Sequence, residues 1–345
     1  MEASNQKAIA LVTGGTSGLG HAVIRRLLSE GYEVRVLLKG DPSAYPDWKT
    51  LPPGCRPYVA DLTLKRKDDE KNLAAACRGV NIVFHIAGAT FNSKFSYNQL
   101  IDTNVIGTEN LLKSMADSNK GAASPAHLIF TSTTTIYGYR RPGETLTETS
   151  EEAPSSHYAE SKLMAEHLIE SFAESHSELF YTIFRIGTIY GQGYEKPHFF
   201  KAFRLVHEQK MRYIGRGANH LPLVNVDDVA DAMLLASHKP KASANQIFNL
   251  TDGVAHTPRE LFGIVAKVLG VAPPSKSVNP TLARLLSKAA DIDYDEYEFL
   301  AGDRAVSIAK IKDKLGWAPS RRIDIDGLLM VEDYMRSTKK ATVRA

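Results

Sequence analysis

The chain has 345 residues, of which 43% are hydrophobic and 23% are charged, a balance typical of globular proteins. It carries 42 Lys and Arg against 39 Asp and Glu residues, and the basic residues are scattered, which argues against a nucleic acid partner. Cys55 and Cys77 are its only cysteines and lack metal-ligand spacing, so we expect reduced thiols, no metal site and a cytoplasmic location. The N-terminal residues do not resemble a secretory signal, and no apolar run is long enough to predict a membrane span.

Predicted strands and helices alternate along the first half of the chain. The predicted strands are Ala8–Val12, Tyr32–Leu38, Pro57–Ala60, Ile82–Ile86, His127–Ser132 and Tyr181–Ile186. The predicted helices are His21–Glu30, Asp69–Arg78, Gln99–Asp117 and Tyr158–Ser175. This order predicts an α/β fold built on a Rossmann-type doubly wound parallel sheet.

The pattern changes after residue 188, where turn-rich segments separate the predicted helices Pro197–Gln209 and Pro258–Leu269. The segments Val224–Ala236 and Gln246–Leu250 indicate a return to the main sheet. We therefore expect a dinucleotide-binding domain in residues 1–188 with a return segment at 224–252. A smaller, discontinuous substrate lobe would comprise residues 189–223 and 253–336, and residues 337–345 would form a frayed tail.

A glycine-rich turn, Thr13–Gly20 (TGGTSGLG), lies between the first predicted strand and the first helix. Glycine permits a tight turn and a close approach of the backbone to a pyrophosphate, which the N-terminus of the following helix also attracts. The position of the turn favours a dinucleotide site over an ordinary loop. The expected contacts there are Gly14, Thr16, Ser17, Gly18 and Leu19.

The end of the second strand bears on which dinucleotide is preferred. A carboxylate at this position holds the ribose 2′-hydroxyl of NAD(H), whereas a cation accommodates the 2′-phosphate of NADP(H). Here Leu38 is followed by Lys39, which favours NADP(H). Asp41 follows two residues later, so NAD(H) remains possible.

Tyr158 and Lys162 lie four positions apart at the start of a predicted helix, so they share one face. A neighbouring ammonium favours the phenolate form of a tyrosine, which can then exchange a proton with a carbonyl or an alcohol while a nicotinamide exchanges a hydride. Ser132 and Thr133 end the fifth predicted strand, where side chains face the ligand crevice of a parallel sheet. One of these hydroxyls is expected to orient the substrate oxygen.

The assembled motifs resemble the extended short-chain dehydrogenase/reductase family over nearly the whole chain. They are TGGTSGLG, Asp61-Leu62, HIAG at 85–88, NVIGT at 104–108, Ser132–Gly138, YAESKLMAE at 158–166, FRIGTIYG at 184–191, VNVDDVADA at 224–232, IFNLTDG at 247–253 and LGWAP at 315–319. One departure is the middle glycine of the turn, which stands at Gly18, whereas many extended members place it at the position of Ser17.

The resemblance implies roles for individual residues. Tyr158 and Lys162 would form the catalytic pair, with Thr133 as the catalytic hydroxyl and Ser132 as its nearest substitute. The implied cofactor contacts outside the turn are Lys39, Asp61 and Leu62 near the adenosine, Ala87 and Gly88 beside the cofactor, the helix asparagine Asn104, the catalytic pair itself, and Arg185 and Gly187.

Two further departures concern the substrate. Sugar-nucleotide enzymes of the family usually carry an Asn and an Arg where this chain has Gly187 and Leu221, and both help to hold the diphosphate. Lys210, Arg212 and Arg216 could compensate from a nearby loop. The GYEVRVLLKG segment instead resembles reductases of the dihydroflavonol-4-reductase and 3β-hydroxysteroid dehydrogenase type.

The leading hypothesis is therefore an NAD(P)(H)-dependent enzyme that interconverts a secondary alcohol and a ketone on a small-molecule substrate. A nucleotide-sugar epimerase, dehydratase or decarboxylase with tightly bound NAD is the alternative. A dinucleotide-sensing regulator without catalysis is a third reading, disfavoured because Tyr158 and Lys162 are both present. The family's helices, here Gln99–Asp117 and Tyr158–Ser175, often pair, so a homodimer is possible.

Overall fold

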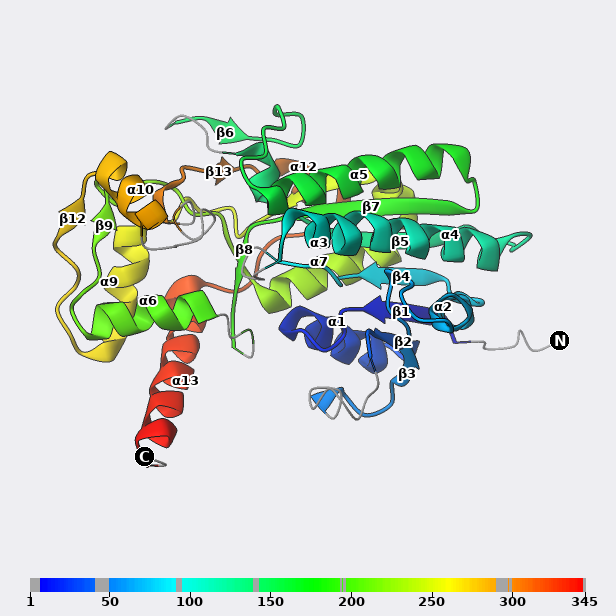
Figure 1. The fold of residues 1–345 in the computed structure, drawn as a ribbon, viewed down its shortest axis with the longest axis horizontal. Helices are drawn as coiled ribbons and strands as arrows, with labels where there is room; N and C mark the ends of the chain where they lie inside the picture. Colours follow the sequence, from blue (N-terminus) through cyan, green and yellow to red (C-terminus); the bar gives the residue numbers. More distant parts are fainter. Residues whose placement is uncertain are drawn as a thin grey trace.

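Seven parallel strands form the main sheet within the part of the chain that the computed structural model describes, which is residues 7–40, 50–90, 95–138, 143–192, 194, 197–289, 297 and 300–343. Their order across the sheet is β11-β7-β5-β4-β1-β2-β3 (Figure 1). The strands are β1 (Ile9–Thr13), β2 (Glu33–Leu38), β3 (Arg56–Val59), β4 (Ile82–His85), β5 (Ala126–Thr133), β7 (Leu179–Ile186) and β11 (Gln246–Leu250). The prediction of a doubly wound α/β fold is confirmed.

Helices cover both faces of this sheet (Figure 1). One face carries α1 (Gly18–Ser29) and α7 (Val226–His238), and the other carries α2 (Asp69–Cys77), α4 (Gly107–Asn119) and α5 (His157–Ser175). Successive side chains of a strand point to opposite faces of the sheet. Ala10 and Val12 of β1 therefore pack in the core beneath α1 and α7, and Leu11 packs in the core beneath α2, α4 and α5. Because both faces are buried, β1 is apolar from Ile9 to Val12 rather than alternating between apolar and polar residues.

The predicted long helix Gln99–Asp117 is wrong in detail. The segment consists of α3 (Tyr97–Ile101), a π-helical turn η2 (Asp102–Ile106) and α4. The backbone N–H of Gly107 donates to the carbonyl of Asp102, five residues earlier. Such a turn accommodates one extra residue and is common at functional sites. Its effect here is to present Asn104 to the loop after β4, as described below.

The return to the main sheet is also only partly as predicted. Gln246–Leu250 joins the sheet beside β7, in agreement with the prediction. The short strand β10 (Leu223–Asn225), however, pairs with β8 (Thr188–Tyr190) in a separate two-stranded sheet. This pairing ties the start of the second lobe to the end of the nucleotide-binding half.

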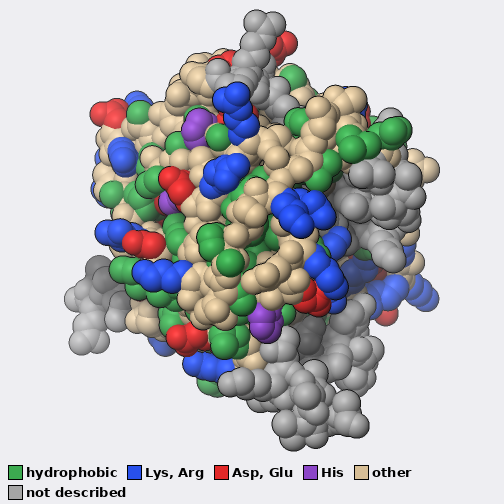
Figure 2. Space-filling model, turned by 90° about the vertical axis from the view of Figure 1, so that its left-hand side faces the viewer, with side chains coloured by type: hydrophobic (Ala, Val, Ile, Leu, Met, Phe, Trp, Pro, Cys, Tyr) green, Lys and Arg blue, Asp and Glu red, His purple; other side chains and the backbone are tan. Residues whose placement is uncertain are grey.

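The second lobe has its own apolar core at the left of Figure 1, where α6 (Pro197–His207), α9 (Pro258–Leu269) and α13 (Ile323–Val343) meet. Phe203, Phe262 and Tyr334 are buried there. The tail expected to fray from Ser337 onward begins within α13, which extends to Val343. Basic and acidic side chains are interspersed on the face that this lobe presents in Figure 2.

The remaining helical elements are η3 (Thr134–Tyr137), α8 (Pro240–Ser243), α10 (Pro280–Ala289) and α12 (Ala309–Leu315). Two further pairs of short strands are β6 (Thr145–Leu146) with β13 (Ala305–Val306), and β9 (Tyr213–Ile214) with β12 (Ser277–Val278).

Among the described residues, no helix combines the length and apolar character needed to cross a bilayer. Within the same ranges, no group of three or more His, Cys, Asp or Glu side chains is arranged to hold a metal ion. Cys55 and Cys77 are both free thiols, and Cys77 is buried in the core.

The packing of β7 generates a stability prediction. Ile183 is fully buried between the sheet and its helices, so Ile183→Ala is expected to lower the free energy of unfolding by about 2–5 kcal/mol. Ile325 on α13 is 60% exposed, and Ile325→Ala serves as the matched control with an expected change within about 0.5 kcal/mol. Urea denaturation of both variants measures the difference, and equal costs would contradict the assigned core.

Candidate active site

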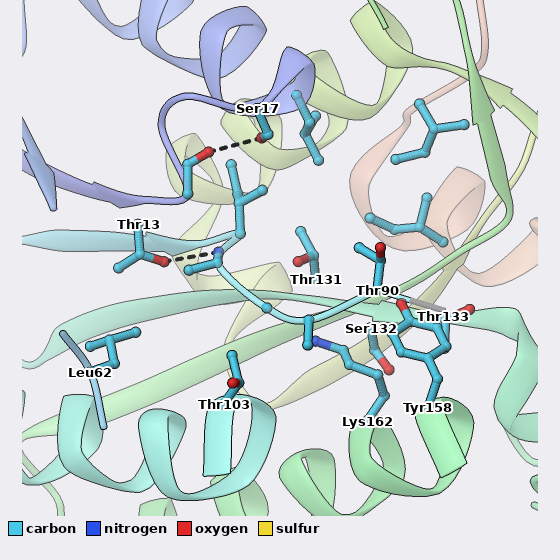
Figure 3. Close-up of a pocket in the computed structure, with 18 of the residues that line it drawn as sticks. Thr13, Ser17, Leu62, Thr90, Thr103, Thr131, Ser132, Thr133, Tyr158 and Lys162 are labelled. Atoms are coloured by element: carbon cyan, nitrogen blue, oxygen red, sulfur yellow. Dashed lines mark hydrogen bonds between the residues drawn. The ribbon is translucent and has the colours of Figure 1, made fainter. Parts of the chain in front are cut away.

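A cavity of about 520 Å³ opens at the carboxyl ends of the parallel strands. Its wall is built from the turn after β1, the ends of β2, β3, β4, β5 and β7, and the start of α5 (Figure 3). The predicted site residues that line it are Gly14, Thr16, Ser17, Leu19, Lys39, Asp61, Leu62, Ala87, Gly88, Ser132, Thr133, Tyr158, Lys162 and Gly187. The structure thus brings together most of the residues that the sequence indicates.

The glycine-rich turn is shaped for a closely approaching ligand. Gly14 adopts a φ of +72°, and a Cβ there would lie 2.7 Å from the backbone nitrogen of Ala87, so no side chain fits. Ser17 caps α1, accepting a hydrogen bond from the N–H of Gly20 at 3.0 Å. The helix therefore begins at Gly18 rather than at His21, with its positive end at the cavity. This cradle fits the pyrophosphate of a dinucleotide.

A series of buried hydrogen bonds holds the loop after β4 against this turn. Thr13 accepts from the N–H of Ala87 at 3.1 Å and contacts Nδ1 of His85 at 2.7 Å. Nε2 of His85 lies 2.9 Å from the hydroxyl of Thr108, which itself donates to the carbonyl of Asn104. His85 must therefore donate from Nε2 and accept at Nδ1, which is a neutral tautomer. Burial lowers the pKa of His85 to about 3, so it stays neutral.

Lys39 and Asp61 stand at the other end of the cavity, after β2 and β3. The Nζ of Lys39 lies 3.6 Å from Oδ2 of Asp61, and the lysine side chain is 61% exposed. Asp61 also accepts from the N–H of Thr63 at 2.9 Å, which holds its carboxylate in place. Asp41, the carboxylate that left NAD(H) as an alternative cofactor in the sequence analysis, lies outside the described residues.

Tyr158 and Lys162 lie side by side at the start of α5, pointing toward the strand ends that carry Ser132 and Thr133 (Figure 3). The helix begins here because Ser156 caps it, accepting from the N–H of Ala159 at 3.2 Å. Tyr158 is half-buried, whereas Lys162 is 4% exposed and its Nζ sits 3.9 Å from the centre of the Phe130 ring. Burial lowers the pKa of Lys162 to about 7.

The two strand-end hydroxyls are held differently. Ser132 donates its hydroxyl hydrogen to the carboxylate of Glu166, so this hydrogen cannot at the same time be donated to a ligand in the cavity. Thr133 accepts from the N–H of Thr135 at 3.2 Å, and its hydroxyl lies 3.0 Å from that of Thr135. Figure 3 shows Thr133 beside the Tyr158 ring. Thr133 is thus the better placed of the two to donate to a bound oxygen.

Three expected cofactor residues do not line the cavity. Gly18 starts α1 behind the turn. Asn104 accepts from the N–H of Ala89 at 2.8 Å and donates to Ser161 at 2.9 Å, so it joins the β4 loop to α5. Arg185 is 1% exposed and pairs with Glu166 and Glu152, so its side chain points away from the cavity.

Some residues of the site were not predicted. Glu166 stands four residues after Lys162, and this continued spacing would have indicated a third residue on the same helix face. His85 ends a strand, the position that drew attention to Ser132, but its role depends on long-range hydrogen bonds that periodicity does not encode. The remaining unpredicted residues of the lining include Thr90, Phe95, Thr103, Thr135, Thr188, Ile189, Tyr194 and Arg304.

Residues 10–251 match the model of the NAD dependent epimerase/dehydratase family. The chain belongs to this family. Its resemblance to extended short-chain dehydrogenases/reductases is thereby confirmed. Apart from Ile9, the matched span covers the seven strands of the main sheet, and it includes the cavity residues from Thr13 to Tyr194.

Relatives of this chain differ in the substrates that their names state. It is 26% identical over 268 residues to sterol-4-alpha-carboxylate 3-dehydrogenase, decarboxylating, of Dictyostelium discoideum, covering 76% of each protein. It is 27% identical over 321 residues to dTDP-6-deoxy-L-talose 4-dehydrogenase (NAD(P)(+)) of Kitasatospora kifunensis, covering 90% of this chain and 91% of that one. The crystal structure of UDP-glucose 4-epimerase from Thermotoga maritima with UDP-glucose is similar with a TM-score of 0.73 at 26% identity, covering 96% of this chain and 99% of that one.

The Gly14 cradle generates a binding prediction. Gly14→Ala forces a Cβ against the backbone of Ala87 and a side chain into a left-handed φ, so dinucleotide affinity is expected to fall at least tenfold. Gly263 on α9 has no atom within 4 Å of an added Cβ, and Gly263→Ala is the control expected to bind normally. Fluorescence titration with NADPH and NADH measures both variants. Unchanged affinity in Gly14→Ala would rule out this turn as the pyrophosphate site.

Proposed function

We propose that the protein interconverts a secondary alcohol and a ketone on a small-molecule substrate, with NAD(P)(H) as cofactor and Tyr158 as the proton-transferring residue. The observation that carries the proposal is the common placement of Tyr158, Lys162 and Thr133 on one wall of the cavity. The relatives named as a 3-dehydrogenase and a 4-dehydrogenase support this reaction class.

The roles follow from the chemistry of each group. When bound, a nicotinamide dinucleotide supplies the hydride donor or acceptor. Tyr158 gives its proton to the carbonyl oxygen in reduction and takes it back in oxidation. Lys162 favours the phenolate through its positive charge, because an ammonium beside a phenol stabilises the ionised form. Thr133 orients the substrate oxygen by donating a hydrogen bond to it.

The region around Gly187 disfavours a sugar-nucleotide substrate. A Cβ at Gly187 would lie 2.5 Å from the carbonyl oxygen of Pro222, so an asparagine cannot replace it without moving the backbone. Leu221 is buried and forms an isolated bridge with His256. The fold shared with UDP-glucose 4-epimerase keeps a nucleotide-sugar enzyme as the second candidate. Dinucleotide that co-purifies with the protein, together with binding of a UDP- or dTDP-sugar, would favour that candidate.

The catalytic assignment predicts the effect of removing one oxygen atom. Tyr158→Phe is expected to lower kcat by about 10²–10⁴-fold in both directions, because the proton donor is lost, while dinucleotide affinity falls far less. Tyr97→Phe, at a tyrosine 37% exposed on α3, is the matched control and should keep normal turnover. The assay follows NADPH consumption with a panel of ketones and the reverse reaction with the corresponding alcohols. Full turnover by Tyr158→Phe would defeat the proposal.

The cofactor part of the proposal favours NADP(H) through Lys39. Lys39→Ala is expected to lower kcat/KM for NADPH about tenfold and to leave that for NADH nearly unchanged, because only NADPH carries the 2′-phosphate. Lys65→Ala, at a neighbouring exposed lysine paired with Asp102, is the control for loss of surface charge. Asp61 beside Lys39 partly offsets its charge, which keeps NAD(H) as the second cofactor. Equal losses with both cofactors would contradict the 2′-phosphate contact.

A further inference from the structure

The face of α5 that packs against β5 carries three ionisable side chains at successive turns, Tyr158, Lys162 and Glu166. The first two line the cavity. Glu166 lies behind them with no exposed surface. A fully buried carboxylate is costly unless its oxygens are well paired, so its partners indicate what it does.

Both oxygens of Glu166 accept hydrogen bonds. Oε1 accepts from the hydroxyl of Ser132, and Oε2 accepts from Nε and Nη2 of Arg185 at 2.9 and 2.7 Å. Burial raises the pKa of Glu166, whereas the charge and donors of Arg185 and the Ser132 hydroxyl oppose that rise. An arginine does not lose its proton in a protein, and all three contacts use the acceptors of a carboxylate. Glu166 and Arg185 therefore form an ion pair at neutral pH.

Arg185 is held from several parts of the fold. Its Nη2 donates to Glu152 in the segment before α5, and its Nη1 donates to the hydroxyl of Tyr137 at 3.1 Å. That hydroxyl in turn donates to Asn249 of β11 at 2.7 Å. A guanidinium fixed in this way leaves the carboxylate of Glu166 little freedom to move.

The fixed negative charge of Glu166 acts on the ammonium of Lys162. Burial lowers the pKa of Lys162 to about 7, and the carboxylate of Glu166 opposes the fall. The groups that face the ammonium from other elements are the Phe130 ring of β5 and the neutral His85 of β4. Tyr158 precedes it on α5, and Arg185 of β7 and Glu152 stand behind Glu166.

We propose that Glu166 is a positioning residue of the Tyr158–Lys162 site. Its carboxylate, fixed by Arg185, holds the Ser132 hydroxyl and keeps a negative charge one helical turn from Lys162, which favours the ammonium form of the lysine at neutral pH. The inference rests on the proposed function, because it assigns Lys162 the task of favouring the phenolate of Tyr158. In this proposal Arg185, which was expected to contact the cofactor, instead holds the carboxylate of Glu166 and has no direct contact with the reacting groups.

The experiment compares Glu166→Gln with Glu152→Gln in the full-length protein. Both variants remove one carboxylate from Arg185, but Glu152 is 28% exposed and its other partner is the exposed His167. Competitive labelling with acetic anhydride, read by mass spectrometry over a range of pH, titrates the amine of Lys162 without cofactor or substrate. Glu166→Gln is expected to lower that pKa from about 7 to about 6, and Glu152→Gln is expected to leave it near 7.

The same comparison has a kinetic readout. At pH 7 the protonated fraction of Lys162 would fall from about one half to about one tenth in Glu166→Gln, so kcat for alcohol oxidation should fall about fivefold. Near pH 5.5 both proteins carry a largely protonated lysine, and the ratio of their kcat values should approach one. A packing defect alone would lower kcat by a similar factor at every pH.

The outcomes separate the two proposals. Equal Lys162 titrations in Glu166→Gln and Glu152→Gln, or a kcat ratio that does not change with pH, would overturn the role of Glu166 while leaving that of Tyr158 intact. Full turnover by Tyr158→Phe would instead overturn the proposed function. Glu166→Asp keeps the charge opposite Arg185 and covers the case in which Glu166→Gln does not fold. It moves the carboxylate by one methylene but retains the negative charge, so the Lys162 pKa is expected to fall less than in Glu166→Gln, and a fall to about 6 or lower counts against the inference.

Discussion

The parallel direction of all seven strands in the main sheet is the constraint on which the site depends. It brings the carboxyl end of every strand to one edge, so residues distant in sequence meet there. Gly14 follows β1, Asp61 follows β3, Ala87 follows β4 and Thr133 ends β5, and all four line one cavity. Each needs only its local position at a strand end to reach the common wall. The helices α1 and α5 then add their first turns, with Ser17 and Tyr158, to the same edge.

The two ends of the cavity differ in how firmly they are built. At the end formed by Lys39 the charged side chain is largely exposed and pairs with one carboxylate across 3.6 Å. At the end formed by Lys162 the polar groups are buried and interlocked, from His85 on one side to Glu166 and Arg185 on the other. Buried polar groups with satisfied partners favour one arrangement, because any displacement leaves a donor or acceptor unpaired. The positions of the side chains are therefore more tightly restrained at the Lys162 end of the cavity than at the Lys39 end.

Much of this arrangement could be predicted from the sequence, and the failures have physical causes. Apolar segments correctly predicted the strands of the first half of the main sheet. The spacing of Tyr158 and Lys162 predicted that both side chains lie on one face of a helix. The π turn at Asp102–Ile106 was not predictable, because its apolar spacing is that of an ordinary helix and the extra residue is revealed only by the bond from the N–H of Gly107 to the carbonyl of Asp102. Strands of two or three residues, such as β8 and β10, contain too little pattern to be detected. The family resemblance implied that Arg185 contacts the cofactor, and the sequence does not reveal which face of a fully buried strand meets the cavity and which meets a helix.

The pairing of β8 with β10 and the return of β11 to the main sheet mean that the chain passes between its two halves more than once. The outer half is consequently made of separate segments of the chain, each of which leaves the same scaffold. Insertions or substitutions within those segments can reshape the outer wall of the cavity while the strand ends of the main sheet stay where they are. Such a layout lets one half vary without disturbing the other, but it also prevents either half from being exchanged as a single contiguous piece.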